Sequence, residues 1–232
     1  MSQIILSLVQ QTLGMTQGVL LFGSHVVGPV DAHSDIDVIV LVDGTASLRR
    51  KKIPTSHGLL DVHLHSSASL KAAWQEQRSR FISFYTHALA TGRILSDSNG
   101  SLARLAAESQ SSWPRRQIRP NWTVYRLALM AKLGDIGREH DAVDSQLLAV
   151  DTYQTILAVR SLNCTGWLAS APLMRRWCAQ SAPLVIARLD AALGAAASGE
   201  PSLLAQEGQE CLTAIGGPLS PSEALAWSGL AA

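Results

Sequence analysis

Hydrophobic positions in the first 110 residues follow two different periods, one typical of helices and one typical of strands. Residues 3–14 carry apolar side chains at helical spacing, whereas residues 38–42, which complete the strand that begins at Asp37, form an unbroken apolar run. That run is too uniformly apolar for a strand with one solvent-exposed face, so we expect other parts of the protein to cover both of its faces. The elements predicted for this region are a helix at 3–14, strands at 18–22, 37–42 and 58–65, a helix from 69 to about 90, a short strand at 93–95 and a helix at 101–109.

The pattern changes near Ser111-Ser112-Trp113-Pro114, where chain breakers coincide with a shift in composition. Beyond this point the chain is rich in Ala and Leu and shows only helical periodicity. Helices are predicted at 121–138, 145–163, 170–195 and 201–214, with a short terminal turn and with Asp144 as an N-cap. The sequence therefore predicts a sheet-containing domain over 1–112 and an all-helical domain over 113–232.

Composition narrows the class of protein. The 232 residues include 19 Lys and Arg against 18 Asp and Glu. Proteins whose main role is to bind long nucleic acids usually carry an excess of basic residues, so this near-neutral charge argues against that role. Three cysteines, Cys164, Cys178 and Cys211, form no pairing framework, and no apolar run approaches the roughly 20 residues of a membrane span. Without the pattern of a signal peptide, the chain is expected to be a cytoplasmic protein with no membrane partner.

The segment 22–42, FGSHVVGPVDAHSDIDVIVLV, holds the most informative chemistry. Asp35 and Asp37 stand at alternate positions at the start of a predicted strand, so their side chains point to the same face while Ile36 points into the core. Two carboxylates this close repel each other unless a cation lies between them. A divalent ion that prefers oxygen ligands, Mg²⁺ or Mn²⁺, is the expected partner.

Asp61 lies in another predicted strand, 58–65, and would bring a third carboxylate to the pair if the two strands are neighbours. Three carboxylates on adjacent strands can hold two metal ions, and such a pair clamps an in-line phosphoryl or nucleotidyl displacement. Gly23 and Ser24 fit the other half of the site, because glycine lets the backbone approach a phosphate while the hydroxyl and amides donate hydrogen bonds.

Gly23-Ser24, ten intervening residues and Asp35-Ile36-Asp37-Val38 resemble the signature of the DNA polymerase β-type nucleotidyltransferase superfamily, especially its minimal and antibiotic nucleotidyltransferases. The resemblance implies an α+β fold: a small mixed sheet flanked by helices, followed by a helical C-terminal bundle. It also implies that Gly23 and Ser24 contact the phosphates of a nucleoside triphosphate (NTP) such as ATP. Asp35, Asp37 and Asp61 would be catalytic residues that bind two Mg²⁺ or Mn²⁺ ions.

The expected reaction moves a nucleoside monophosphate from the NTP to a hydroxyl or similar group and releases pyrophosphate. A small-molecule acceptor, such as an antibiotic or a metabolite, agrees with the near-neutral charge and with a helical domain able to form a second cleft wall. A homodimer with a shared cleft is compatible with this kind of enzyme. The alternatives are a toxin–antitoxin-type enzyme that modifies a protein or tRNA, and a non-catalytic nucleotide-binding relative. Val27 favours the latter, because many family members carry arginine there.

Several further residues have both a functional and a structural interpretation. His63 and His65 share a face with Asp61 and could contact nucleotide or metal, although strand histidines often serve packing. His25 and His33 lie in the loop expected near the phosphates. The run Arg49–Lys52 is interpreted as a solvated loop rather than a polymer-binding patch. Candidates for triphosphate binding or proton transfer in the helical domain are Lys132, Asp135, Arg138 and Glu139.

Overall fold

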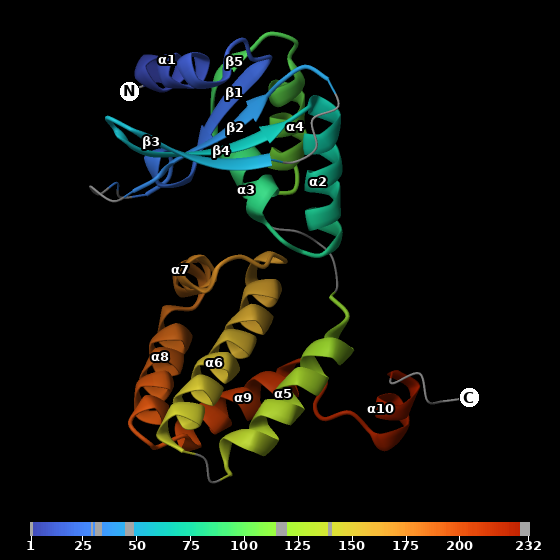
Figure 1. Ribbon diagram of the computed structural model, residues 1–232. Helices are drawn as coiled ribbons and strands as arrows, with labels where there is room; N and C mark the ends of the chain where they lie inside the picture. Colours follow the sequence, from blue (N-terminus) through green and yellow to red (C-terminus); the bar gives the residue numbers. More distant parts are fainter. Residues whose placement is uncertain are drawn as a thin grey trace. The chain divides into compact units, whose positions relative to one another are not determined.

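The computed structural model describes residues 2–28, 30, 34–44, 49–114, 120–138 and 141–227 (Figure 1). The chain divides into two compact units, Met1–Pro114 and Arg115–Ala232. The first unit combines a five-stranded mixed sheet with helices, and in the second the described elements are all helices. The predicted α+β fold class is thereby confirmed.

The sheet of the first unit has the strand order β3-β4-β2-β1-β5. Its strands are β1 (Gly18–Phe22), β2 (Ile36–Leu41), β3 (Arg49–Thr55), β4 (Gly58–His65) and β5 (Arg93–Asp97). Strands β2 and β4 pair in parallel, and the three other pairings are antiparallel. Strand β2 therefore lies at the centre (Figure 1), and the expected burial of its apolar run is confirmed from Val38 to Leu41.

Helices cover both faces of this sheet. On one face, Ile5 and Val9 of α1 (Ser2–Leu13) pack against the side chains of Val19, Val38 and Val62. On the other face, side chains from three helices pack against Leu20, Phe22 and Ile39. These helices are α2 (Ser67–Ser79), α3 (Phe84–Thr91) and α4 (Ser101–Gln110).

Two predictions about this unit were wrong. The helix expected from 69 to about 90 is two helices, α2 and α3, separated by a turn in which Phe81 has a positive φ of 63°. No Gly or Pro marks this break; instead, a hydrogen bond from Trp74 Nε1 to Thr86 Oγ1 (3.0 Å) joins α2 to α3. The run Arg49–Lys52, expected in a loop, forms the start of edge strand β3, where charged side chains discourage pairing with other chains.

The second unit contains α5 (Trp122–Ile136), α6 (Ala142–Thr165), α7 (Ala171–Ser181), α8 (Pro183–Ala197), α9 (Ser202–Ala214) and α10 (Pro221–Trp227). Its core gathers around α6, whose buried side chains include Ile156 and Leu157. The helix expected at 170–195 is broken by Pro183, which lacks the amide hydrogen that a continuous helix requires. The N-cap of α6 is Asp141 rather than Asp144, because Asp141 accepts the amide hydrogens of Val143 and Asp144. None of the described helices is both long and apolar enough to cross a bilayer.

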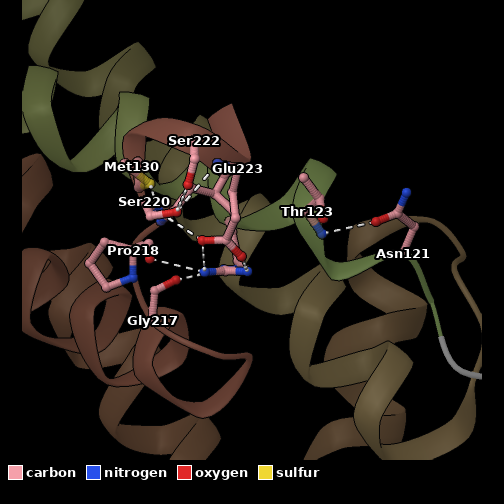
Figure 2. A network of polar contacts seen from close by, with 10 residues as sticks. Asn121, Thr123, Met130, Gly217, Pro218, Ser220, Ser222 and Glu223 are labelled. Atoms are coloured by element: carbon pink, nitrogen blue, oxygen red, sulfur yellow. Dashed lines mark hydrogen bonds and ion pairs between the residues drawn. The ribbon is translucent and has the colours of Figure 1, made fainter. Parts of the chain in front are cut away.

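Polar contacts tie the end of the chain to α5 (Figure 2). Arg126 of α5 donates to the carbonyl oxygens of Gly217 (2.7 Å) and Pro218 (2.9 Å) and pairs with Glu223 (3.1 Å). Figure 2 shows Ser220 beside Glu223, whose carboxylate accepts the Ser220 amide hydrogen. These contacts hold the segment from Gly217 to Glu223 against the helix.

Two glycines allow the packing of each unit to be tested. A Cβ on Gly92 would collide with the carbonyl oxygen of Ala88 and lie 2.6 Å from Leu20 Cδ2, so Gly92→Ala should lower the free energy of unfolding by about 1–3 kcal/mol. Gly194, within α8, has open space around its Cβ position, so Gly194→Ala should raise stability by about 0.5–1 kcal/mol. Urea unfolding measures both, and equal effects at the two positions would contradict this packing.

Candidate active site

Strand pairing brings the three predicted carboxylates to one place. The parallel register of β2 and β4 sets Asp37 opposite Asp61, and Asp35 directly precedes β2. Because side chains alternate along a strand, Asp35 and Asp37 share the face that Asp61 occupies on the next strand. The strands of Asp37 and Asp61 are therefore neighbours, which is the arrangement that a third carboxylate in the site requires.

The Gly-Ser pair lies beside these carboxylates. Phe22, the last residue of β1, pairs with Asp37, and the chain turns at once into a 3₁₀ turn over Gly23–His25. Gly23 has a φ of 73°, and a Cβ at this position would collide with the Asp37 carboxylate. Glycine is thus required both by the backbone conformation and by the neighbouring acid. Ser24 follows on the same turn.

Asp37 is the carboxylate of the acidic site that has no direct ion-pair partner among the described residues. Its side chain is half-buried, and no hydrogen bond or ion pair to another described residue engages its carboxylate. Burial raises the pKa of Asp37 to about 6, and the nearby negative charges of Asp61 and Asp35 act in the same direction. A cation placed against Asp37 would relieve this cost.

Asp61 has the opposite environment, because Arg50 of β3 binds its carboxylate through two nitrogens. Arg50 Nε lies 2.9 Å from Oδ1 and 3.2 Å from Oδ2, and Arg50 Nη2 lies 2.6 Å from Oδ2. The Asp61 side chain is only 1% exposed. The hydrogen bonds from Arg50 hold the pKa of Asp61 below its usual range despite burial.

Lys52 adds a second positive charge. Its Nζ lies 2.7 Å from Asp35 Oδ2 and 3.8 Å from Asp61 Oδ2. Arg50 and Lys52 were not predicted as site residues, because the sequence pattern places them in a solvated loop. The alternation that identifies a strand is hidden here, since charged residues fill both faces of β3 at its start. A hairpin could have been inferred from Ile53-Pro54-Thr55, because a turn follows these residues directly before β4.

His63 and His65 lie on the same face as Asp61, as predicted, and both serve packing. The His63 ring contacts the rings of Phe22 and Phe84, with centroids 5.7 and 5.1 Å away. His65 Nε2 lies 2.9 Å from the Tyr85 hydroxyl, and burial lowers the pKa of His65 to about 4. His63 Nε2 is 3.9 Å from Asp61 Oδ1, while burial lowers the pKa of His63 and favours the neutral ring.

The remaining candidates in the helical unit have structural partners where they are described, whereas His25 Nε2 is buried with no hydrogen-bond partner among the described residues. In the helical unit, Lys132 forms an ion pair with Asp151 of α6, and Arg138 pairs with Asp135 (3.3 Å). Glu139 and His33 lie outside the described part of the chain. The His25 ring lies near enough to Asp37 to oppose the rise in its pKa.

The donor set fits a divalent cation at Asp35 and Asp37 better than at Asp61. Asp37 offers a half-buried carboxylate without a direct partner among the described residues, and the described partner of Asp35 is an exposed lysine. Asp61 already accepts hydrogen bonds from Arg50 on both of its oxygens. Among the described residues, no group of three or more His, Cys, Asp or Glu side chains is already arranged around a common metal position. The involvement of all three acids in metal binding therefore stays a prediction.

The raised pKa of Asp37 predicts how stability depends on pH. Since the folded-state pKa of about 6 exceeds the ordinary value of 3.8, the folded protein binds this proton more tightly, and its stability falls as pH rises from about 4 to 6. Asp37→Asn should therefore stabilise the metal-free protein at pH 7.5 by about 1–2 kcal/mol, after allowance for solvent screening. Urea unfolding of both proteins between pH 7.5 and 4.5 should show this difference narrowing toward acid. A difference independent of pH would contradict the assigned environment.

Comparisons with known proteins add a likeness of shape. No protein-family model and no curated protein matches the chain. Among solved structures, the chain is similar to the nucleotidyltransferase-like protein from Exiguobacterium sibiricum 255-15, with 14% sequence identity and a TM-score of 0.42. The match covers 99% of this chain and 85% of that protein.

Proposed function

We propose that the protein is a metal-dependent nucleotidyltransferase that moves a nucleoside monophosphate from an NTP to an acceptor. The observation that carries the proposal is the β2–β4 register, which gathers Asp35, Asp37 and Asp61 beside the Gly23-Ser24 turn. Carboxylates from two adjacent strands together with a tight glycine turn supply both halves of a phosphoryl-transfer site.

Each residue has a distinct role in this proposal. Asp35 and Asp37 hold Mg²⁺ or Mn²⁺, with Asp61 completing a two-ion site, and the ions supply charge neutralisation for the triphosphate. Gly23 permits close approach of the backbone, and the Ser24 hydroxyl together with backbone amide hydrogens of the turn donates hydrogen bonds to the β- and γ-phosphates. The oxygen of the acceptor forms a bond to the α-phosphorus, and the bond from that phosphorus to the β-phosphate oxygen breaks, which releases pyrophosphate.

Catalysis in such a site rests on positioning and on charge neutralisation. The apolar part of β2, from Val38 to Leu41, is buried and fixes the direction in which Asp35 and Asp37 point. We propose a small-molecule acceptor, such as an antibiotic or a metabolite. The near balance of 19 basic and 18 acidic residues supports this choice over a long nucleic acid.

A second candidate function is nucleotide binding without catalysis. The ion pair between Arg50 and Asp61 favours it, because a carboxylate occupied on both oxygens by a guanidinium must change partner to bind a metal ion. This candidate expects NTP affinity to be the same with and without Mg²⁺. The first proposal expects Mg²⁺ to strengthen binding of the triphosphate.

Transfer of label from each α-³²P-labelled NTP, with Mg²⁺ and a panel of small hydroxyl-bearing acceptors, tests the proposal. Asp37→Asn should lower the transfer rate on the order of 10²–10³-fold, because it removes the negative charge that holds the cation. Asp43→Asn is the matched control: Asp43 follows the opposite end of β2 and accepts a hydrogen bond from Gln17, so its loss should leave the rate unchanged.

Undiminished transfer by Asp37→Asn would refute the assigned metal role. If label appears instead on a co-purified protein or tRNA, the reaction stands and the acceptor is macromolecular. Absence of transfer together with Mg²⁺-independent NTP binding would support the binding-only candidate.

A further inference from the structure

We propose that Lys52 is an exchangeable counter-ion of the acidic site: it neutralises Asp35 in the metal-free protein and moves to the triphosphate when a metal-bound nucleotide enters. This inference rests on the proposed function and assigns a triphosphate-binding role to a residue outside the predicted carboxylate and Gly-Ser set. It concerns the edge strand β3, whose basic run packs onto the site.

The register of β3 decides which of its basic residues face the acids. In the antiparallel pairing with β4, Lys52 lies opposite Asp61, and Arg50 lies opposite His63. Lys51, between them, lies opposite Val62, whose side chain packs in the core on the other face of the sheet. Alternation along the strand therefore directs Arg50 and Lys52 to the acidic face and Lys51 away from it.

The two cations on the acidic face are held very differently. Arg50 engages both oxygens of the buried Asp61 carboxylate, a geometry that a planar guanidinium matches and that a lysine cannot reproduce. Within the described part of the chain, the Lys52 ammonium donates one hydrogen bond, to Asp35, and its side chain is 49% exposed. An exposed contact between a flexible ammonium and one carboxylate oxygen is weak, so Lys52 is the partner that an incoming cation displaces.

The position of the Lys52 ammonium group explains why displacement would be productive. It lies 2.7 Å from Asp35 and 3.8 Å from Asp61, and thus between two of the three carboxylates assigned to the metal ions. A metal ion on Asp35 must compete with this charge. Once displaced, the ammonium stays on its strand beside the site, where the triphosphate brings new negative oxygens for it to bind.

A simpler interpretation is that basic residues on β3 only protect the edge of the sheet from pairing with other chains. That interpretation treats Lys51 and Lys52 alike, because both are exposed residues of the same edge strand. The exchange proposal separates them. Lys51→Gln is therefore a matched control for Lys52→Gln, with the same chemical change one position away and on the opposite face.

The test measures binding rather than activity. Mn²⁺ affinity is determined by electron paramagnetic resonance, and affinity for inorganic tripolyphosphate in saturating Mg²⁺ by calorimetry, for wild type, Lys52→Gln and Lys51→Gln. Lys52→Gln should bind Mn²⁺ alone about threefold to fivefold more tightly, because a competing charge is gone. It should bind Mg²⁺–tripolyphosphate about tenfold more weakly, because a phosphate contact is lost. Lys51→Gln should match wild type in both assays.

These opposite changes distinguish exchange from a structural defect, which would weaken both ligands together. If Lys52→Gln behaves as Lys51→Gln does, or if a second variant, Lys52→Met, weakens both ligands, the exchange proposal is wrong. Asp37→Asn separates this failure from failure of the proposed function. If Asp37→Asn loses Mn²⁺ binding, the proposed metal site at Asp37 is supported even when the exchange proposal fails. If Asp37→Asn binds Mn²⁺ as tightly as wild type, the proposed function and the exchange proposal are both wrong.

Discussion

The ion pair between Arg50 and Asp61 allows a carboxylate to lie buried within the sheet, and the rest of the acidic site depends on it. Asp61 is fully buried, and an unpaired charge in such a place would be strongly destabilising. Arg50 meets both oxygens from the adjacent edge strand, so the negative charge is kept rather than protonated. With Asp61 ionised, the parallel register places a fixed negative charge next to Asp37.

The consequence is a pair of neighbouring carboxylates with pKa values displaced in opposite directions. Arg50 lowers the pKa of Asp61, whereas burial and the charge on Asp61 raise the pKa of Asp37 to about 6. Pairs of acids separated in this way are typical of sites where each group has a different task. Here Asp61 is a fixed charge with its partner built into the fold, and Asp37 is left with a charge that a ligand can compensate.

The sequence was sufficient to predict the parts of the site that follow from strand periodicity. The bounds of β1 and β4 agree with the predicted strands, and the shared face of Asp37 and Asp61 follows once these strands are neighbours. The break between α2 and α3 could not be predicted, because it lies at Phe81, without Gly or Pro, and is held by tertiary contacts such as that between Trp74 and Thr86. Strand β3 was missed because its hydrophobic pattern is absent where its charged residues begin.

The charged run of β3 also shows why composition alone cannot assign roles to basic residues. The four consecutive basic residues Arg49–Lys52 can be interpreted as a solvated loop or as protection of a sheet edge, and both interpretations treat the four residues as equivalent. Because side chains alternate along a strand, the pairing of β3 with β4 places Arg50 and Lys52 on the face of Asp61 and places Arg49 and Lys51 on the other face. Only the register carries this distinction, and register is set by the hairpin turn and by the buried face of β4 rather than by the charged residues themselves. A basic edge strand beside buried acids therefore has to be interpreted residue by residue, from the strand that it pairs with.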